Sequence, residues 1–166
     1  MTDVSRMGGL FVFKGLTQEQ VETVVKLGRP KKIRLGEPVL REGDSGESMF
    51  ILDEGEVEIT RRLGLTTDDS VGPQHRKRLI HLAAPQIFGE MGLLEDAGRS
   101  ATVTAVTDCT VLEVTREDFQ KLVDANPKLG YQIVLNMAVV LSGRVRHVNA
   151  DVMKLTAALS LSLGNR

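Results

Sequence analysis

One short stretch of the sequence combines an acid, an arginine and small residues at a spacing that could bind a phosphorylated sugar. Phe88, Gly89 and Glu90 precede a short apolar segment, and Arg99 follows nine positions after Glu90. A guanidinium can hold a phosphate through two parallel hydrogen bonds, and a carboxylate can accept hydrogen bonds from sugar hydroxyls. The pair alone is weak support, because most acid–arginine pairs of this kind are exposed ion pairs.

Small residues around the two charged side chains would let a ligand approach the backbone. Ser100 and Ala101 follow Arg99 directly, and Ser100 adds a hydroxyl donor. A short helical turn after Gly89 would present free amide groups, which favour anions. The sequence therefore predicts one ligand-binding site, formed by Phe88, Gly89, Glu90, Met91, Gly92, Arg99, Ser100 and Ala101.

This stretch resembles the phosphate-binding cassette of cyclic-nucleotide-binding domains, the family of catabolite activator proteins and of protein kinase A regulatory subunits. The family pattern of Phe-Gly-Glu, an apolar residue, a small residue and Leu, then Arg, small, Ala and Thr, is filled between Phe88 and Thr102. The similarity extends over about residues 10–145 and includes Gly36, Glu42-Gly43-Asp44, Glu54-Gly55-Glu56 and Asn126-Pro127. It implies that Glu90 binds the ribose 2′-hydroxyl and Arg99 the cyclic phosphate, with Ser100 and the amides near Gly89 and Ala101 completing the site.

The resemblance does not determine which base the nucleotide carries. Relatives bond adenine through polar side chains of the long helix, and the corresponding places here are Arg144 and Val145, which do not match. Arg144 is expected to be a solvated helix residue, with stacking on the base as the alternative. Ser100 is compatible with adenine and with guanine. We favour cAMP over cGMP as the ligand only because cAMP is the more frequent ligand of the family.

The elements that must position these residues are short strands between two helical regions. Thr17–Gln20 forms a capping box that begins a helix ending near Gly28, and strand-like runs punctuated by glycine follow from residue 31 to residue 113. Such a pattern is typical of an antiparallel barrel or jelly roll. With the resemblance, we expect a mainly β fold with flanking helices: an eight-stranded antiparallel jelly-roll barrel followed by a long C-terminal helix. Residues 1–130 would form the nucleotide-binding barrel and its N-terminal helix, and residues 131–162 a dimerisation and hinge helix.

The last helix carries an apolar stripe with the spacing of a coiled coil. Positions alternate by four and three at Val134, Ala138, Leu141, Val145, Val148, Val152, Leu155 and Leu159. A helix of roughly 30 residues is about 45 Å long, more than a small barrel can cover. Its first turns are expected to pack on the barrel, and the 134–159 heptad seam to form a parallel homodimer.

Composition excludes several classes of protein. The chain has 166 residues, a net charge of −1 and one cysteine, Cys109. Without a basic excess, direct DNA binding is not expected, and the basic run His75–Arg78 at the end of a polar segment is interpreted as an exposed loop tip. The lone cysteine and the lack of a long apolar run predict a cytoplasmic protein without a membrane partner.

Nothing in the sequence indicates catalysis. His75, His81 and His147 are too scattered for a metal site, and no activated Ser, Cys or carboxylate pair is recognisable. We therefore expect a regulatory sensor rather than an enzyme, with no metal or cofactor, which relays ligand binding through the C-terminal helix to an effector that the sequence does not identify. A dimerising interaction domain, with a pocket that binds no ligand or a cyclic dinucleotide, is the alternative.

Overall fold

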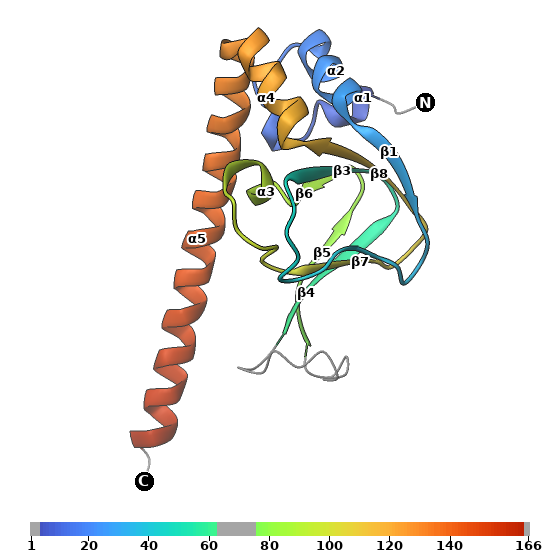
Figure 1. Cartoon of the computed structure of the whole chain (residues 1–166). Helices are drawn as coiled ribbons and strands as arrows, with labels where there is room; N and C mark the ends of the chain where they lie inside the picture. Colours follow the sequence, from blue (N-terminus) through green and yellow to red (C-terminus); the bar gives the residue numbers. More distant parts are fainter. Residues whose placement is uncertain (1–3, 63–75, 165–166) are drawn as a thin grey trace.

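The structure is a computed structural model that describes residues 4–62 and 76–164. Two antiparallel sheets face each other, short helices pack at one end, and a long helix runs along the side (Figure 1). The strands are β1 (Arg29–Ile33), β2 (Pro38–Leu40), β3 (Ser48–Glu54), β4 (Glu56–Arg62), β5 (Arg76–Ala83), β6 (Gln86–Phe88), β7 (Thr102–Ala105) and β8 (Cys109–Thr115). The helices are α1 (Val4–Met7), η1 (Phe11–Phe13), α2 (Gln18–Leu27), α3 (Met91–Leu94), α4 (Arg116–Ala125) and α5 (Pro127–Gly164).

The eight strands form an open sandwich and not the closed barrel that the sequence suggested. One sheet has the order β1-β8-β3-β6 and the other β2-β7-β4-β5, and within the described ranges no strand pairs across the two sheets. A barrel needs continuous strand pairing around its circumference. Here the edge strands are β1 and β6 in one sheet and β2 and β5 in the other, and in the described residues no edge strand pairs with an edge of the opposite sheet.

The four residues Met49–Leu52 of strand β3 are all apolar because both faces of the strand are buried. Met49 and Ile51 pack against the helices at the end of the sandwich, whereas Phe50 and Leu52 point between the two sheets. Successive side chains of a strand alternate between faces, so a strand with two buried faces needs apolar residues at every position. The protein thus has two apolar cores that share β3.

The predicted start of the first helix is confirmed. The Thr17 side chain accepts a hydrogen bond from the Gln20 amide at 3.3 Å, and the Gln20 side chain accepts one from the Thr17 amide at 2.9 Å. Helix α4 begins in a similar way at Thr115, whose hydroxyl accepts from the Asp118 amide at 3.1 Å. The same hydroxyl donates to the Asp118 carboxylate. This hydrogen bond and the charge of Arg29 lower the pKa of Asp118.

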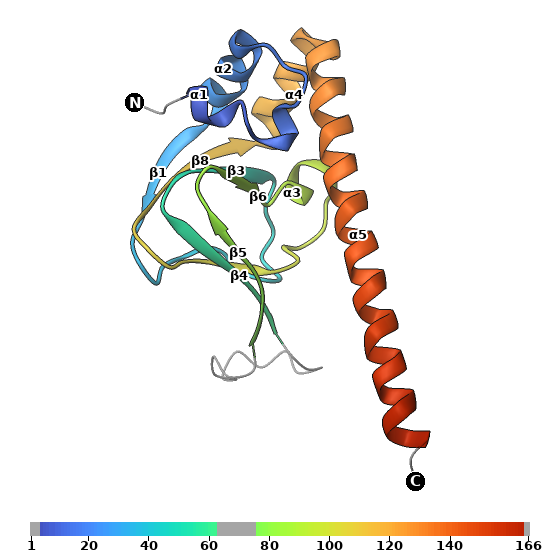
Figure 2. The ribbon, with the colours of Figure 1, turned by 180° about the vertical axis from the view of Figure 1, so that it is seen from behind.

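Helix α5 packs on the rest of the molecule through a different face from the apolar stripe. Leu129, Ile133 and Met137 are buried against the helices and β3, and the side-chain amide of Asn136 donates to the carbonyl groups of Val12 and Lys14, which ties α5 to η1. The first two residues of the stripe, Val134 and Ala138, are exposed and Leu141 is half-buried, so the expectation that the early turns of the stripe pack on the barrel was wrong. Both views show the far half of α5 extending beyond the sandwich (Figures 1 and 2).

The polar segment was expected to last until Arg78, but β5 already begins at Arg76, which pairs with Arg62 of β4. The rest of that segment, with His75, lies outside the described residues. Strand β6 was not predicted, because three residues give too short a pattern. Over the described ranges, no helix combines the length and the apolar character needed to cross a membrane.

Candidate functional site

All the residues that the sequence grouped into one site line a single pocket of about 290 Å³. Its lining includes residues of α3, next to the predicted turn, and Arg144 and Val148 of α5. Its lining includes the predicted Phe88, Gly89, Glu90, Met91, Gly92, Arg99, Ser100 and Ala101. These residues come from one continuous segment that runs from β6 through α3 to the start of β7, so the chain folds back on itself around the pocket.

The turn between β6 and α3 depends on glycine. Gly89 has a φ of 73°, in the left-handed region that other residues rarely adopt. The amides of Gly92 and Leu93 donate to the carbonyl oxygens of Gly89 and Glu90 at 3.0 Å each, which closes the turn. Phe88, only 2% exposed, anchors the turn by stacking on the Phe50 ring with centroids 5.4 Å apart.

Arg99 is the buried cation of the pocket. Its Nη1 donates to the Ser48 carbonyl at 2.7 Å and to the Gly89 carbonyl at 3.3 Å, and its Nη2 donates to the Ser48 hydroxyl at 3.0 Å. The guanidinium also lies over the Phe50 ring, with 6.0 Å to the centroid. Burial lowers the pKa of Arg99, whereas the carboxylate of Glu113 raises it. A fixed guanidinium in a partly dry pocket is a strong site for an anion.

Glycines make room for this arginine. The backbone of Arg99 is held by the turn after β2, through its amide to the Asp44 carbonyl at 2.8 Å and its carbonyl to the Gly43 amide at 2.9 Å. A Cβ atom on Gly46 would lie 2.5 Å from Nε of Arg99, and one on Gly92 would also overlap the guanidinium. Gly92 was predicted among the ligand-binding residues; it lines the pocket and also leaves the space that the Arg99 guanidinium occupies.

Glu90, the second predicted charged residue, contacts helix α5. It is 4% exposed, and its carboxylate forms an ion pair with Nη1 of Arg144. The sequence favoured Arg144 as a solvated helix residue; its side chain is 42% exposed, but it also lines the pocket and pairs with Glu90, which was not predicted. The two residues are 54 positions apart. No local spacing could have indicated their contact.

The outer wall of the pocket is apolar although it is exposed. Leu79 and Ile80 of β5 and Val148 of α5 line it and remain between 40% and 59% exposed. Sequence reasoning placed none of these three in the site. A buried cation, a carboxylate and an apolar wall suit a ligand with a phosphate, a sugar and a flat ring. In the part of the chain that the structure describes, no three His, Cys, Asp or Glu side chains gather to hold a metal ion.

Comparison with known proteins agrees with this arrangement. Residues 30–126 match the model of the family described as cyclic nucleotide-binding domain. The cyclic AMP receptor protein of Thermus thermophilus is 30% identical over 146 residues, which cover 88% of this chain and 62% of that protein. The crystal structure of the Thermus thermophilus catabolite activator protein superimposes with a TM-score of 0.75 at 27% identity, covering 88% of this chain and 63% of that one.

The relatives are longer than this chain and differ in kind. A cyclic nucleotide-gated potassium channel of Rhizobium etli is 30% identical over 122 residues, which cover 74% of this chain and 30% of the channel. The chain thus spans less than two thirds of the receptor protein and less than one third of the channel. The expectation that neither DNA nor a membrane is a partner finds no support among such relatives.

Proposed function

The chain belongs to the cyclic nucleotide-binding domain family, and from this premise we propose that it binds a cyclic mononucleotide as a regulatory sensor without catalytic activity. We favour cAMP over cGMP, because a cyclic AMP receptor protein resembles most of the chain. The observation that carries the proposal is the buried pair of Arg99 and Glu90 in one pocket, one a donor for phosphate and the other an acceptor for a hydroxyl. A cytoplasmic location remains a prediction from the sequence, as does an effector of unknown identity.

The assignment of Glu90 to the ribose predicts a selective loss of affinity. Glu90→Gln should weaken the binding of cAMP by about 10- to 100-fold, because a hydrogen bond to a charged acceptor contributes about 1.5–3 kcal/mol. Binding of 2′-deoxy-cAMP, which lacks the donating hydroxyl, should change little. Calorimetric titration of both nucleotides into both proteins measures the difference.

Asp96→Asn is the matched control for Glu90→Gln. Asp96 is exposed in the segment after α3, and removing its charge should leave both affinities unchanged. Equal losses for cAMP and for its 2′-deoxy analogue in Glu90→Gln would mean that Glu90 supports Arg99 or α5 instead of the ribose.

The contact between Glu90 and Arg144 suggests how binding is relayed to α5. A ribose hydroxyl on Glu90 would compete with Arg144 for the carboxylate. Displacement of Arg144 would release one side chain that holds α5 beside the pocket. A ligand shifts a conformational equilibrium only through such a difference in contacts between the two states. We propose that Arg144 is the link between the pocket and the helix.

Replacement of Arg144 tests this relay. In the wild type, nucleotide should change amide hydrogen exchange in residues 141–150 by at least about fivefold, the lower end of ordinary allosteric coupling. Arg144→Gln should show the ligand-bound exchange pattern already without nucleotide. A ligand-induced change of equal size in the variant and in the wild type would contradict the relay.

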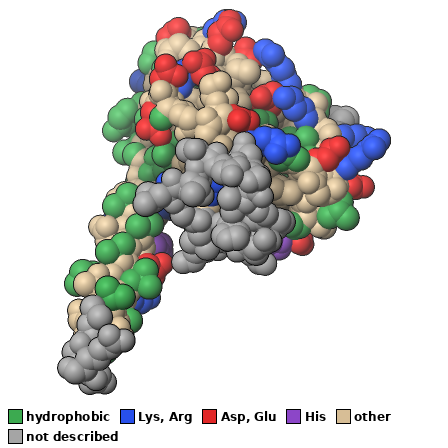
Figure 3. All heavy atoms as spheres, turned by 60° about the horizontal axis from the view of Figure 1, so that its bottom comes forward, with side chains coloured by type: hydrophobic (Ala, Val, Ile, Leu, Met, Phe, Trp, Pro, Cys, Tyr) green, Lys and Arg blue, Asp and Glu red, His purple; other side chains and the backbone are tan. Residues whose placement is uncertain are grey.

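The exposed stripe of α5 suggests a second copy of the chain as partner. Val145, Val152, Leu155 and Leu159 are each more than half exposed, and hydrophobic side chains lie along the far part of this helix (Figure 3). Val148 belongs to both the stripe and the pocket wall, so a helix packed on the stripe would also border the ligand. We propose a parallel homodimer through residues 134–159, in which the partner's helix adjoins the apolar wall.

A further inference from the structure

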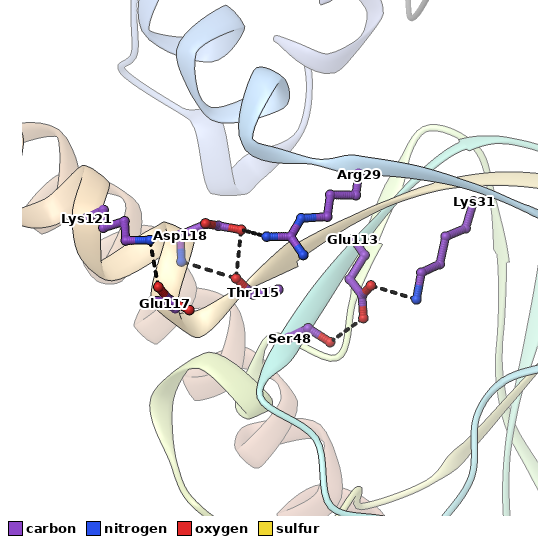
Figure 4. A network of polar contacts seen from close by, with 8 residues as sticks. All are labelled: Arg29, Lys31, Ser48, Glu113, Thr115, Glu117, Asp118 and Lys121. Atoms are coloured by element: carbon purple, nitrogen blue, oxygen red, sulfur yellow. Dashed lines mark hydrogen bonds and ion pairs between the residues drawn. The ribbon is translucent and has the colours of Figure 1, made fainter.

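Behind Arg99, a row of polar contacts leads away from the pocket to the outer strand β1. The Ser48 hydroxyl accepts from Nη2 of Arg99 at 3.0 Å and donates to the Glu113 carboxylate at 3.1 Å. The other carboxylate oxygen of Glu113 pairs with Nζ of Lys31 at 2.6 Å (Figure 4). Charges of opposite sign thus alternate from Arg99 through Glu113 to Lys31.

The single hydrogen of the Ser48 hydroxyl gives this row a direction. When it points at Glu113, the lone pairs of the oxygen are left to accept from Arg99. Ser48 is 6% exposed, and it lines a second pocket of about 610 Å³ together with Arg99, Glu113 and Lys31. Glu113 therefore orients the acceptor that holds Nη2.

Glu113 also provides the negative charge that Arg99 needs when the pocket is empty. Of the acids that line the pocket, Glu90 is engaged by Arg144 and Glu95 is exposed, and the direct acceptors of Arg99 are neutral oxygens of Ser48 and Gly89. A buried cation with no opposite charge nearby is costly. The direction in which Glu113 moves the pKa of Arg99, upward against burial, agrees with this role.

We propose that Glu113 is a positioning residue of the phosphate site: it compensates the charge of Arg99 in the free protein and thereby limits how strongly Arg99 attracts a phosphate. The inference rests on the proposed binding of a cyclic nucleotide at Arg99. It predicts changes of opposite sign at the two ends of the row. Loss of the Glu113 charge leaves phosphate as the main counter-charge of Arg99, whereas loss of Lys31 leaves Glu113 free to hold Arg99 more tightly.

The test compares the affinity for cAMP of the wild type, Glu113→Gln and Lys31→Met, measured by calorimetry at low salt. Glu113→Gln should bind about fivefold more tightly, and Lys31→Met about threefold more weakly, as expected for partly screened charges in and near the protein. In Glu113→Gln, the melting temperature should fall more for the free protein than for the complex. Glu117→Gln is the control, because Glu117 is 77% exposed and pairs with Lys121, and its affinity should not change.

The signs separate the possible outcomes. Unchanged affinity in Glu113→Gln, or weaker binding in both variants, would overturn the role of Glu113 and would fit a merely structural one. Because Lys31 is half exposed, Lys31→Met should fold, and tighter binding or no change in it overturns the proposal even if Glu113→Gln is unstable. A wild type that binds no cyclic nucleotide would defeat the proposed function and this inference together, whereas a binding wild type isolates the inference.

Discussion

Arg99→Gln is expected to lower the affinity for the preferred cyclic nucleotide by at least about 100-fold. Breaking a buried ion pair by removing one partner costs about 3–5 kcal/mol, and each 1.4 kcal/mol is a factor of ten in affinity. Glutamine is shorter and uncharged, so the Ser48 carbonyl, which Nη1 of Arg99 contacts at 2.7 Å, loses this donor while the pocket keeps a polar side chain. Calorimetry of the wild type and the variant measures the loss.

Two further variants make the Arg99 result interpretable. Arg99→Lys keeps the charge but loses the two-pronged geometry, so its affinity should fall between those of the wild type and Arg99→Gln. Arg41→Gln removes an exposed charge just after β2 and should bind normally. If Arg99→Gln stays folded by circular dichroism and loses less than about tenfold in affinity, Arg99 does not bind the phosphate.

Val152→Glu combined with Leu155→Glu is expected to convert the dimer into a monomer. Both side chains are exposed in the single chain, and both would be buried at a coiled-coil interface. In a parallel dimer each new carboxylate would face the same carboxylate of the partner helix, and the like charges would repel. Each unpaired buried charge costs several kcal/mol. Light scattering at tens of micromolar should therefore give twice the chain mass for the wild type and the chain mass for the variant.

The same helix supplies a matched control for the dimer. Ala150 and Ala157 are exposed and lie on the opposite face from the stripe, so Ala150→Glu with Ala157→Glu adds equal charge without entering the interface. This control should remain a dimer. Nucleotide binding should persist in both double variants, because neither pair of positions lines the pocket. A wild type that is monomeric under these conditions would contradict the proposed homodimer through residues 134–159.

The part of the site that the sequence could predict is the part that is continuous along the chain. Most of residues 88–101 line one pocket, so their types and order could be interpreted together. Gly46, Ser48 and Arg144 reach Arg99 or Glu90 from other elements, at separations of 51–54 positions, and each of the three is unremarkable by itself. Contacts of this kind depend on how the elements pack, which a pattern of spacing does not encode.

The fold shows the same division between local and non-local features. The capping box at Thr17 and the break at Asn126 are signals within four residues, and both were predicted correctly. Closure of the sheets and the packing face of α5 depend on pairing between distant segments. The heptad pattern marked the exposed stripe of α5 and not the buried set of Leu129, Ile133 and Met137, because two apolar faces overlap in its first turns.

The most direct test of the account is calorimetric titration of the wild-type chain with cAMP, cGMP, 5′-AMP and a cyclic dinucleotide. We expect saturable binding of cAMP or cGMP, one per chain, with a dissociation constant below about 100 µM, equivalent to more than about 5 kcal/mol. Linear 5′-AMP should bind much more weakly, because its dianionic phosphate does not match a site with one buried arginine. No binding of either cyclic mononucleotide, or preferential binding of the cyclic dinucleotide, would contradict the proposed function.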